Sequence, residues 1–82
     1  MAFVYIVECA DGSLYTGWAV DVEQRVKVHN TGRGARYTRL HGPVKLVYAE
    51  EQPDRVAAMK RELEIKRWPR EKKLRLIRVR GL

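Results

Sequence analysis

The chain has 82 residues, of which 45% are hydrophobic and 33% charged, a composition that excludes an intrinsically disordered segment and predicts one domain over residues 1–82. Its lone cysteine, Cys9, excludes an internal disulfide and is typical of a reducing compartment such as the cytoplasm. The net charge of +7 resides in a basic C-terminal part, residues 60–82, which predicts a polyanionic partner, either nucleic acid or an anionic membrane surface.

The first two elements are expected to form a β-hairpin. Residues 3–9 are mostly β-branched or aromatic, the sequence Ala10-Asp11-Gly12 is a turn signal, and residues 13–19 are typical of a returning strand. A two-residue turn would place Tyr5 and Tyr15 on opposite faces, whereas a three-residue loop with a left-handed Gly12 would place them on the same face. We predict the three-residue loop.

A helix is expected after the hairpin, capped by Asp21 and closed by Gly32. Val22, Val26 and His29 would share one of its faces. Arg25 precedes His29 by four residues, so these two side chains should also be neighbours. The segment that follows is basic and contains glycines. It can lay Arg33, Arg36 and Arg39 along a phosphate backbone, with Tyr37 available for stacking, although a solvated connector is the alternative.

A strand over residues 44–49 and two further helices complete the pattern. The second helix should run from Pro53-Asp54 to about Arg67, with a core stripe made of Val56, Met59 and Leu63. Pro69 suits the first turn of the last helix. The resulting order, β-β-α-β-α-α, predicts an α+β domain with a small three-stranded antiparallel sheet flanked by helices.

Two tripeptides carry a resemblance to a known family. The pair Val4-Tyr5-Ile6 and Tyr15-Thr16-Gly17 resembles the paired tripeptides that name the GIY-YIG nuclease superfamily, and Arg25, His29-Asn30 and Glu62 continue that pattern. Residues 32–38 and 58–66 are similar to a subgroup of short bacterial single-domain members. Val4 stands where the motif has Gly, and Thr16 stands where it has Ile. Members use neither side chain for chemistry.

The resemblance implies hydrolysis of phosphodiester bonds assisted by a divalent metal ion, usually magnesium, with manganese as a substitute. Glu62 matches the metal-binding carboxylate and Arg25 the arginine that contacts the scissile phosphate. Tyr5 matches a tyrosine proposed to help deprotonate the attacking water, and Tyr15 lines the same site. His29 lies near a position that is catalytic in some branches.

Each of these residues has a structural alternative. A magnesium ion needs only one or two carboxylates beside its waters and phosphate oxygens, so Glu62 is sufficient, but an exposed glutamate paired with Lys66 is the ordinary interpretation. Arg25 has the planar fork that matches a phosphate, but it can equally pair with Asp21 or Glu23 on the surface.

The aromatic and histidine candidates are open in the same way. Tyr5 and Tyr15, taken singly, are more typical of core packing with a hydrogen-bonded hydroxyl. His29 can relay a proton at neutral pH or simply interact with the helix C-terminus.

The leading hypothesis is a metal-dependent endonuclease acting on DNA, with repair or recombination as the expected setting. Lys66, Lys72 and Lys73 are the lysines expected to contact the nucleic acid, and a partner protein is expected to supply target choice to a monomer or weak dimer. The alternatives are a nucleic-acid-binding module with little or no hydrolysis, or an interaction subunit of a repair complex that docks through the basic part. No apolar run approaches the roughly 20 residues of a membrane span, so a soluble cytoplasmic protein is expected.

Overall fold

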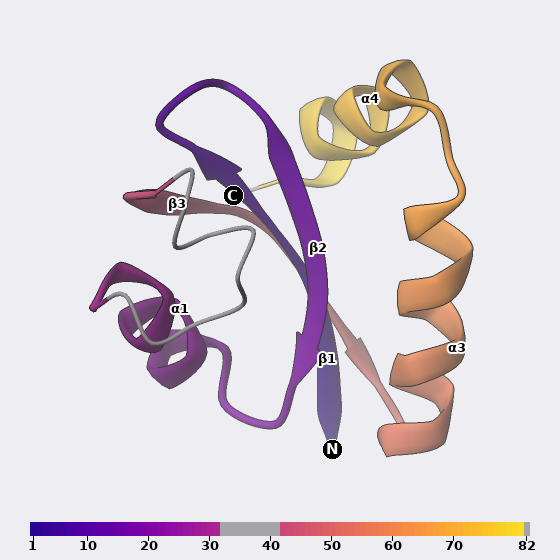
Figure 1. Ribbon diagram of the computed structural model, residues 1–82. Coiled ribbons are helices and arrows are strands. Elements are labelled where there is room, and N and C mark those ends of the chain that lie inside the picture. Colours follow the sequence, from indigo (N-terminus) through magenta and orange to yellow (C-terminus); the bar gives the residue numbers. More distant parts are fainter. Residues whose placement is uncertain (32–41, 82) are drawn as a thin grey trace.

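The computed structural model describes residues 1–31 and 42–81, which form a three-stranded antiparallel sheet with helices on both faces (Figure 1). The strands are β1 (Ala2–Cys9), β2 (Leu14–Ala19) and β3 (Val44–Gln52). They lie in the order β2-β1-β3, so β1 is central and β2 and β3 are edges. The predicted fold class and element order are confirmed.

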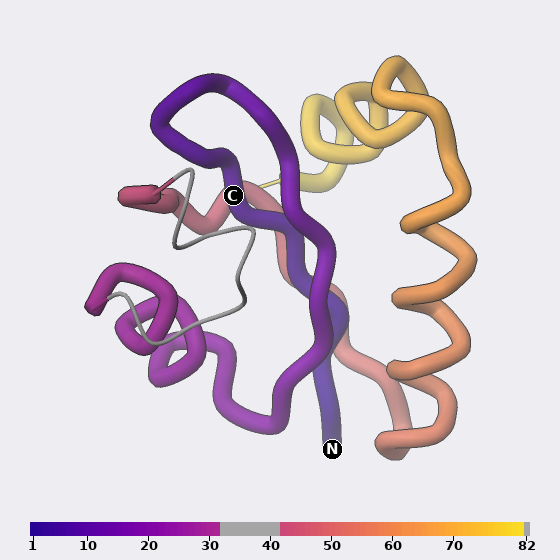
Figure 2. The backbone as a smooth tube through the Cα atoms, viewed as in Figure 1, coloured from indigo at the N-terminus to yellow at the C-terminus, as the bar shows by residue number. Residues whose placement is uncertain are grey.

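The helices divide between the two faces of the sheet, as the backbone trace makes clear (Figure 2). Helix α1 (Val22–Asn30) covers one face, and helices α3 (Arg55–Lys66) and α4 (Arg70–Arg80) lie on the other. Asp21 and Asp54 cap α1 and α3, because each carboxylate accepts a hydrogen bond from the backbone amide three residues later. Within the described ranges, each helix is too short or too polar to cross a bilayer.

The core has two layers because the central strand β1 is buried on both faces. Val4 and Ile6 pack against Ala58 and Ile65 of α3, while the alternate residues of β1 pack under α1. This arrangement explains the nearly continuous apolar run of β1, which a strand with one solvated face would not show. Cys9 belongs to the α1 layer and is 4% exposed, as expected of a packed thiol.

The core stripe predicted for the second helix is wrong. Val56, Met59 and Leu63 are 59%, 47% and 52% exposed, whereas Ala58 and Ile65 are fully buried. The prediction followed the largest apolar side chains, but α3 turns its small Ala58 toward the sheet, which allows a close approach of the helix. The exposed stripe therefore lies on the outer surface of α3.

Candidate active site

The hairpin register decides which side chains can meet, and it brings Tyr5 and Tyr15 to one face. Tyr5 lies opposite Gly17, and Val7 lies opposite Tyr15, so both tyrosines point toward α1. The connection is the predicted three-residue loop: Gly12 has φ +86°, and Cys9 donates its amide to the carbonyl of Ser13 at 2.8 Å. A glycine is needed at this left-handed position.

Gly17 has a packing role that the sequence did not reveal. A Cβ atom at this position would lie 2.5 Å from the Tyr5 hydroxyl and 2.7 Å from its Cζ atom. The phenol of Tyr5 therefore lies directly over the bare backbone of β2 and reaches toward that edge of the sheet. The register pairs Tyr5 with Gly17, but the sequence carries no signal for how closely the ring approaches the backbone.

Helix α1 supplies the hydrogen-bond partner of Tyr5. The Tyr5 hydroxyl and His29 Nε2 are 2.8 Å apart, and the two residues are only 1% and 3% exposed. The adjacent Asn30 fixes this end of the helix to β3, because its side-chain amide donates to the Val44 carbonyl at 3.1 Å and accepts from the Val44 amide at 2.7 Å. Val22 and Val26 share the packed face with His29, as expected.

The protonation of the pair follows from its surroundings. Burial raises the pKa of Tyr5 to about 12, and the nearby Tyr15 and Glu62 act in the same direction, while Arg25 opposes them. Burial and the charge of Arg25 both lower the pKa of His29 from 6.5. At neutral pH the pair is thus a neutral phenol hydrogen-bonded to a neutral imidazole, which the ring of Tyr15 flanks at a centroid distance of 5.5 Å from His29.

Arg25 faces this pair instead of the surface carboxylates of its own helix. Its positive charge acts to lower the pKa of both the Tyr5 hydroxyl and His29, so Arg25 lies near the pair. Within the described residues it forms no ion pair with Asp21 or Glu23. The side chain is nevertheless exposed, which leaves it able to contact an incoming anion.

Glu62 approaches the same place from α3, on the other face of the sheet. Its side chain is 16% exposed, and its charge contributes to the raised pKa of Tyr5. The ion pair with Lys66 that belongs to the alternative interpretation is present but loose at 3.7 Å, and Glu62 is not the exposed residue that this interpretation required. Lys66 Nζ also lies 5.6 Å from the centroid of the Tyr15 ring. These contacts place both residues at the β2 edge.

The donor set suits a magnesium-type ion held by one carboxylate, not a metal enclosed by protein ligands. Among the described residues no three His, Cys, Asp or Glu side chains are grouped closely enough to bind a metal together. Glu62 is partly shielded, and within the described parts of the chain its one ion pair is with the distant ammonium group of Lys66, so its oxygens can accept a hydrated cation. A carboxylate oxygen of this kind is a ligand that suits magnesium or manganese.

The remaining predicted contacts are not gathered here. Lys72 lies over the ring of Trp68 with Nζ 4.2 Å from its centroid, at the junction of α3 and α4. Lys73 is a half-buried residue of α4, and nothing in the described parts of the chain brings it to Tyr5. Four predicted nucleic-acid contacts lie outside the described residues: Arg33, Arg36, Tyr37 and Arg39.

Comparison with known proteins gives one consistent family. A family model described as the GIY-YIG catalytic domain matches residues 1–75. The UPF0213 protein of Staphylococcus aureus strain Mu3 is 59% identical over 78 residues, which cover 95% of each chain. The solution NMR structure of a UPF0213 protein from Bacillus halodurans is similar with a TM-score of 0.63, 46% identity and coverage of 99% of this chain and 87% of that one. A second NMR structure, of a protein from E. faecalis, gives a TM-score of 0.61 at 35% identity over 94% of this chain and 82% of that chain.

Proposed function

The chain belongs to the GIY-YIG family and has its nuclease-like fold, and from this we propose that it is a metal-dependent endonuclease that hydrolyses phosphodiester bonds in DNA. One observation carries the proposal. The buried hydroxyl of Tyr5 is hydrogen-bonded to His29 and electrostatically coupled to Arg25 and Glu62, which come from helices on opposite faces of the sheet. A purely structural tyrosine does not need such a combination of charges around it.

Arg25 and Glu62 have complementary roles in this proposal. The exposed guanidinium of Arg25 binds two oxygens of the scissile phosphate and stabilises the charge that develops there in the transition state. Glu62 holds the divalent ion, which when bound supplies positive charge that polarises the phosphate. Lys66, loosely paired with Glu62, would neutralise the adjacent phosphate.

Tyr5 and His29 form the proposed path for the proton. A phenol with a pKa of about 12 is not ionised at neutral pH, so it cannot act as a base without giving up its own proton. His29 is kept neutral by its lowered pKa, and its Nε2 lies 2.8 Å from the hydroxyl. In the tautomer with hydrogen on Nδ1, Tyr5 passes its proton to Nε2 as it takes one from the attacking water.

The same observations favour one alternative, a nucleic-acid-binding module with little or no hydrolysis. Tyr5 is 1% exposed and His29 is 3% exposed, so water reaches the pair only after the surrounding side chains move. Arg25 and Lys66 are exposed and would bind a phosphate backbone without that movement. Repair or recombination remains the expected setting for either activity.

Cleavage assays distinguish the two functions. Single-stranded, duplex and branched DNA are incubated with the protein in magnesium, in manganese and in EDTA. The nuclease proposal predicts cleavage that requires metal, and losses of roughly 100-fold or more for Glu62→Gln and Arg25→Ala. Glu71→Gln and Lys27→Ala make the same charge changes at exposed positions, on α4 and α1, and should leave the rate unchanged.

Three outcomes are decisive. Equal losses in the matched controls would show that net charge, and not the site, sets the rate. Binding by wild type with no cleavage of any DNA in either metal would establish the binding module. Cleavage that persists in EDTA would overturn the metal requirement.

A further inference from the structure

A pocket at the end of β2 shares Arg25 with the candidate active site. It has a volume of about 320 Å³ and lies where β2 leads into α1. Its walls include Trp18, Val28, Arg25 and, from the first turn of α3, Arg55. Figure 1 shows β2 running between α1 and α3, the elements that supply most of these residues. The volume is at the lower end of the range for small-molecule sites, which suits one nucleotide and not a duplex.

The chemistry of the walls matches that of a nucleotide. Trp18 is half-buried, so one part of its ring packs on the core while the rest is open. Arg25 and Arg55 are exposed, and no described carboxylate forms an ion pair with Arg55. The acidic Asp21 also lines the pocket, but its carboxylate already accepts the amide of Gln24 as the cap of α1. A partly open aromatic ring in the same pocket as two guanidinium groups that pair with no described carboxylate favours an anion that carries a flat ring.

Arg25 connects this pocket to the candidate active site. The same side chain lines the pocket, and its positive charge acts on the Tyr5 hydroxyl. An occupant of the pocket is therefore held beside whatever phosphate Arg25 binds at the active site. A nucleic-acid strand, in which the next base and the next phosphate follow along the backbone, fills both places at once, whereas a free small molecule does not.

We propose that the Trp18–Arg55 pocket is a nucleotide subsite for the residue next to the scissile phosphate, with its base stacked on Trp18 and its phosphate held by Arg55. This rests on the proposed function, because it places DNA at the Arg25 site. Stacking tolerates any base, since every base has a flat face. The subsite would therefore select an unpaired, exposed nucleotide without reading its sequence, so the substrate is single-stranded or frayed at the cut.

Tryptophan fluorescence tests the stacking directly. In the Trp68→Phe background Trp18 is the sole tryptophan, and its emission reports on the pocket alone. The probe is an eight-nucleotide DNA strand in EDTA, so that cleavage plays no part, and the matched control is an abasic strand of equal length. The proposal predicts saturable quenching by the first strand and none by the second. Quenching by both strands equally, or by neither, would overturn it.

Affinity measurements with the same two strands separate the base from the phosphate. Trp18→Leu should weaken binding of the normal strand by roughly 5- to 150-fold, with the abasic strand unaffected. Trp18→Phe keeps an aromatic face and should recover most of the loss, and a thermal melt of each variant shows that the fold is retained. Unchanged affinity in a folded Trp18→Leu variant would contradict the subsite.

Arg55 is exposed, so replacing it tests the subsite without changing the hydrophobic core. Arg55→Ala should weaken both strands and lower the salt dependence of binding by about one phosphate, a slope change of roughly 0.7 for a single strand. Lys45→Ala removes one exposed charge from β3 and should do neither. If metal-dependent cleavage is unchanged in the Trp18 and Arg55 variants, the subsite is wrong but the nuclease proposal stands. If the DNA strand quenches Trp18 but no metal-dependent cleavage is found, the nuclease proposal is wrong but the subsite stands.

Discussion

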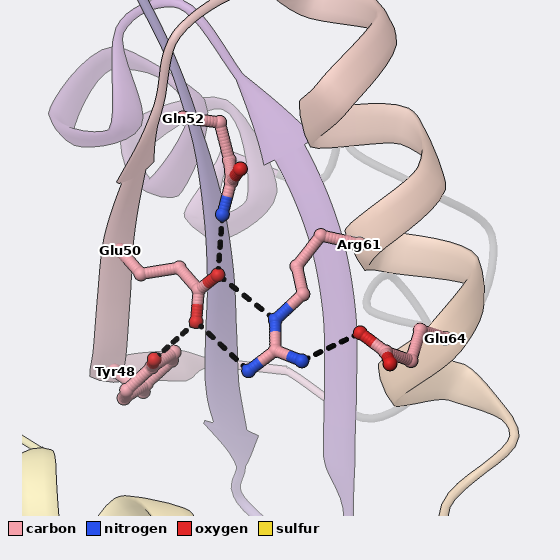
Figure 3. Close-up of polar contacts among 5 residues, drawn as sticks. All are labelled: Tyr48, Glu50, Gln52, Arg61 and Glu64. Carbon is pink, nitrogen blue, oxygen red and sulfur yellow. Dashed lines mark hydrogen bonds and ion pairs between the residues drawn. The ribbon is translucent and has the colours of Figure 1, made fainter.

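Arg61 and Glu62 are consecutive residues of α3, but their side chains point to different strands and differ in how many partners surround them. Arg61 turns toward β3 and donates to Glu50 through Nε at 2.9 Å and through its terminal nitrogen at 3.3 Å (Figure 3). Glu50 also accepts from Tyr48 and Gln52. Glu62 turns toward the β2 edge, where the described residues offer it only a lysine at 3.7 Å.

The contrast shows how to tell a structural carboxylate from one available to a ligand. Burial opposes ionisation of Glu50, but hydrogen bonds from Arg61 and Tyr48 outweigh it and hold the pKa of Glu50 below its usual value. Glu50 is fully engaged by its neighbours and has little capacity left for a metal. Glu62 is similarly shielded, at 16% exposed against 19%, but keeps that capacity. The number of hydrogen-bond and ion-pair partners, more than burial, distinguishes Glu50 from Glu62.

Arg61→Ala tests the structural half of this comparison and should have the largest effect on stability. It leaves Glu50 partly buried without its cation, which should lower the free energy of unfolding by about 2–4 kcal/mol. Glu62→Gln should change it by less than about 1 kcal/mol, because a loose ion pair contributes little. Urea unfolding of both variants measures this. Equal losses would mean that Glu62 is also part of the framework.

Gly17→Ala probes the close contact beneath Tyr5. The added methyl group would lie 2.5 Å from a hydroxyl that is buried on all sides, so we expect a loss of about 1–3 kcal/mol and a weakened Tyr5–His29 hydrogen bond. Urea unfolding and the ring-nitrogen NMR signals of His29 report the two effects. Gly12→Ala is the control: it strains the backbone at φ +86° with no atom within 4 Å, so it should reduce stability but leave the His29 signals unchanged.

The two regions should also lose stability in different pH windows. His29 has a folded pKa below its ordinary 6.5, so the unfolded chain binds its proton first, and stability falls as pH drops from about 6.5, by up to about 1.4 kcal/mol per pH unit. Glu50 also has a lowered pKa, so its contribution is lost only as pH drops below about 4.5. Unfolding measured at pH 7.5, 6 and 5 should show the first fall, and His29→Gln should abolish it while Glu50→Gln preserves it.

The sequence predicted the half of the site that depends on regular spacing. The hairpin loop fixed the register of Tyr5 and Tyr15, and the i, i+4 relation placed Arg25 beside His29. The Glu50 network was not foreseen, because the strand was predicted only over residues 44–49, whereas β3 continues to Gln52, and an acidic residue at the end of a strand looks solvated until its partners are known. The contact of Gly17 with Tyr5 was missed for a similar reason. The Glu50 network depends on how closely α3 approaches the sheet, and the Gly17–Tyr5 contact depends on how closely the Tyr5 ring approaches β2. The periodicity of a sequence does not predict such distances.

Thr16→Val gives the smallest expected effect and tests one of the two family positions where this chain departs from the motif. Thr16 is 3% exposed, and among the described residues its hydroxyl has no hydrogen-bond partner. An unsatisfied buried hydroxyl is unfavourable, so a valine of nearly the same shape should raise the free energy of unfolding by about 1 kcal/mol. Thr31→Val should act in the opposite direction, because the Thr31 hydroxyl donates to the Val28 carbonyl at 2.8 Å. A loss of stability for Thr16→Val would mean that the hydroxyl is satisfied in solution, and that the α3 side of β2 is wetter than its packing indicates.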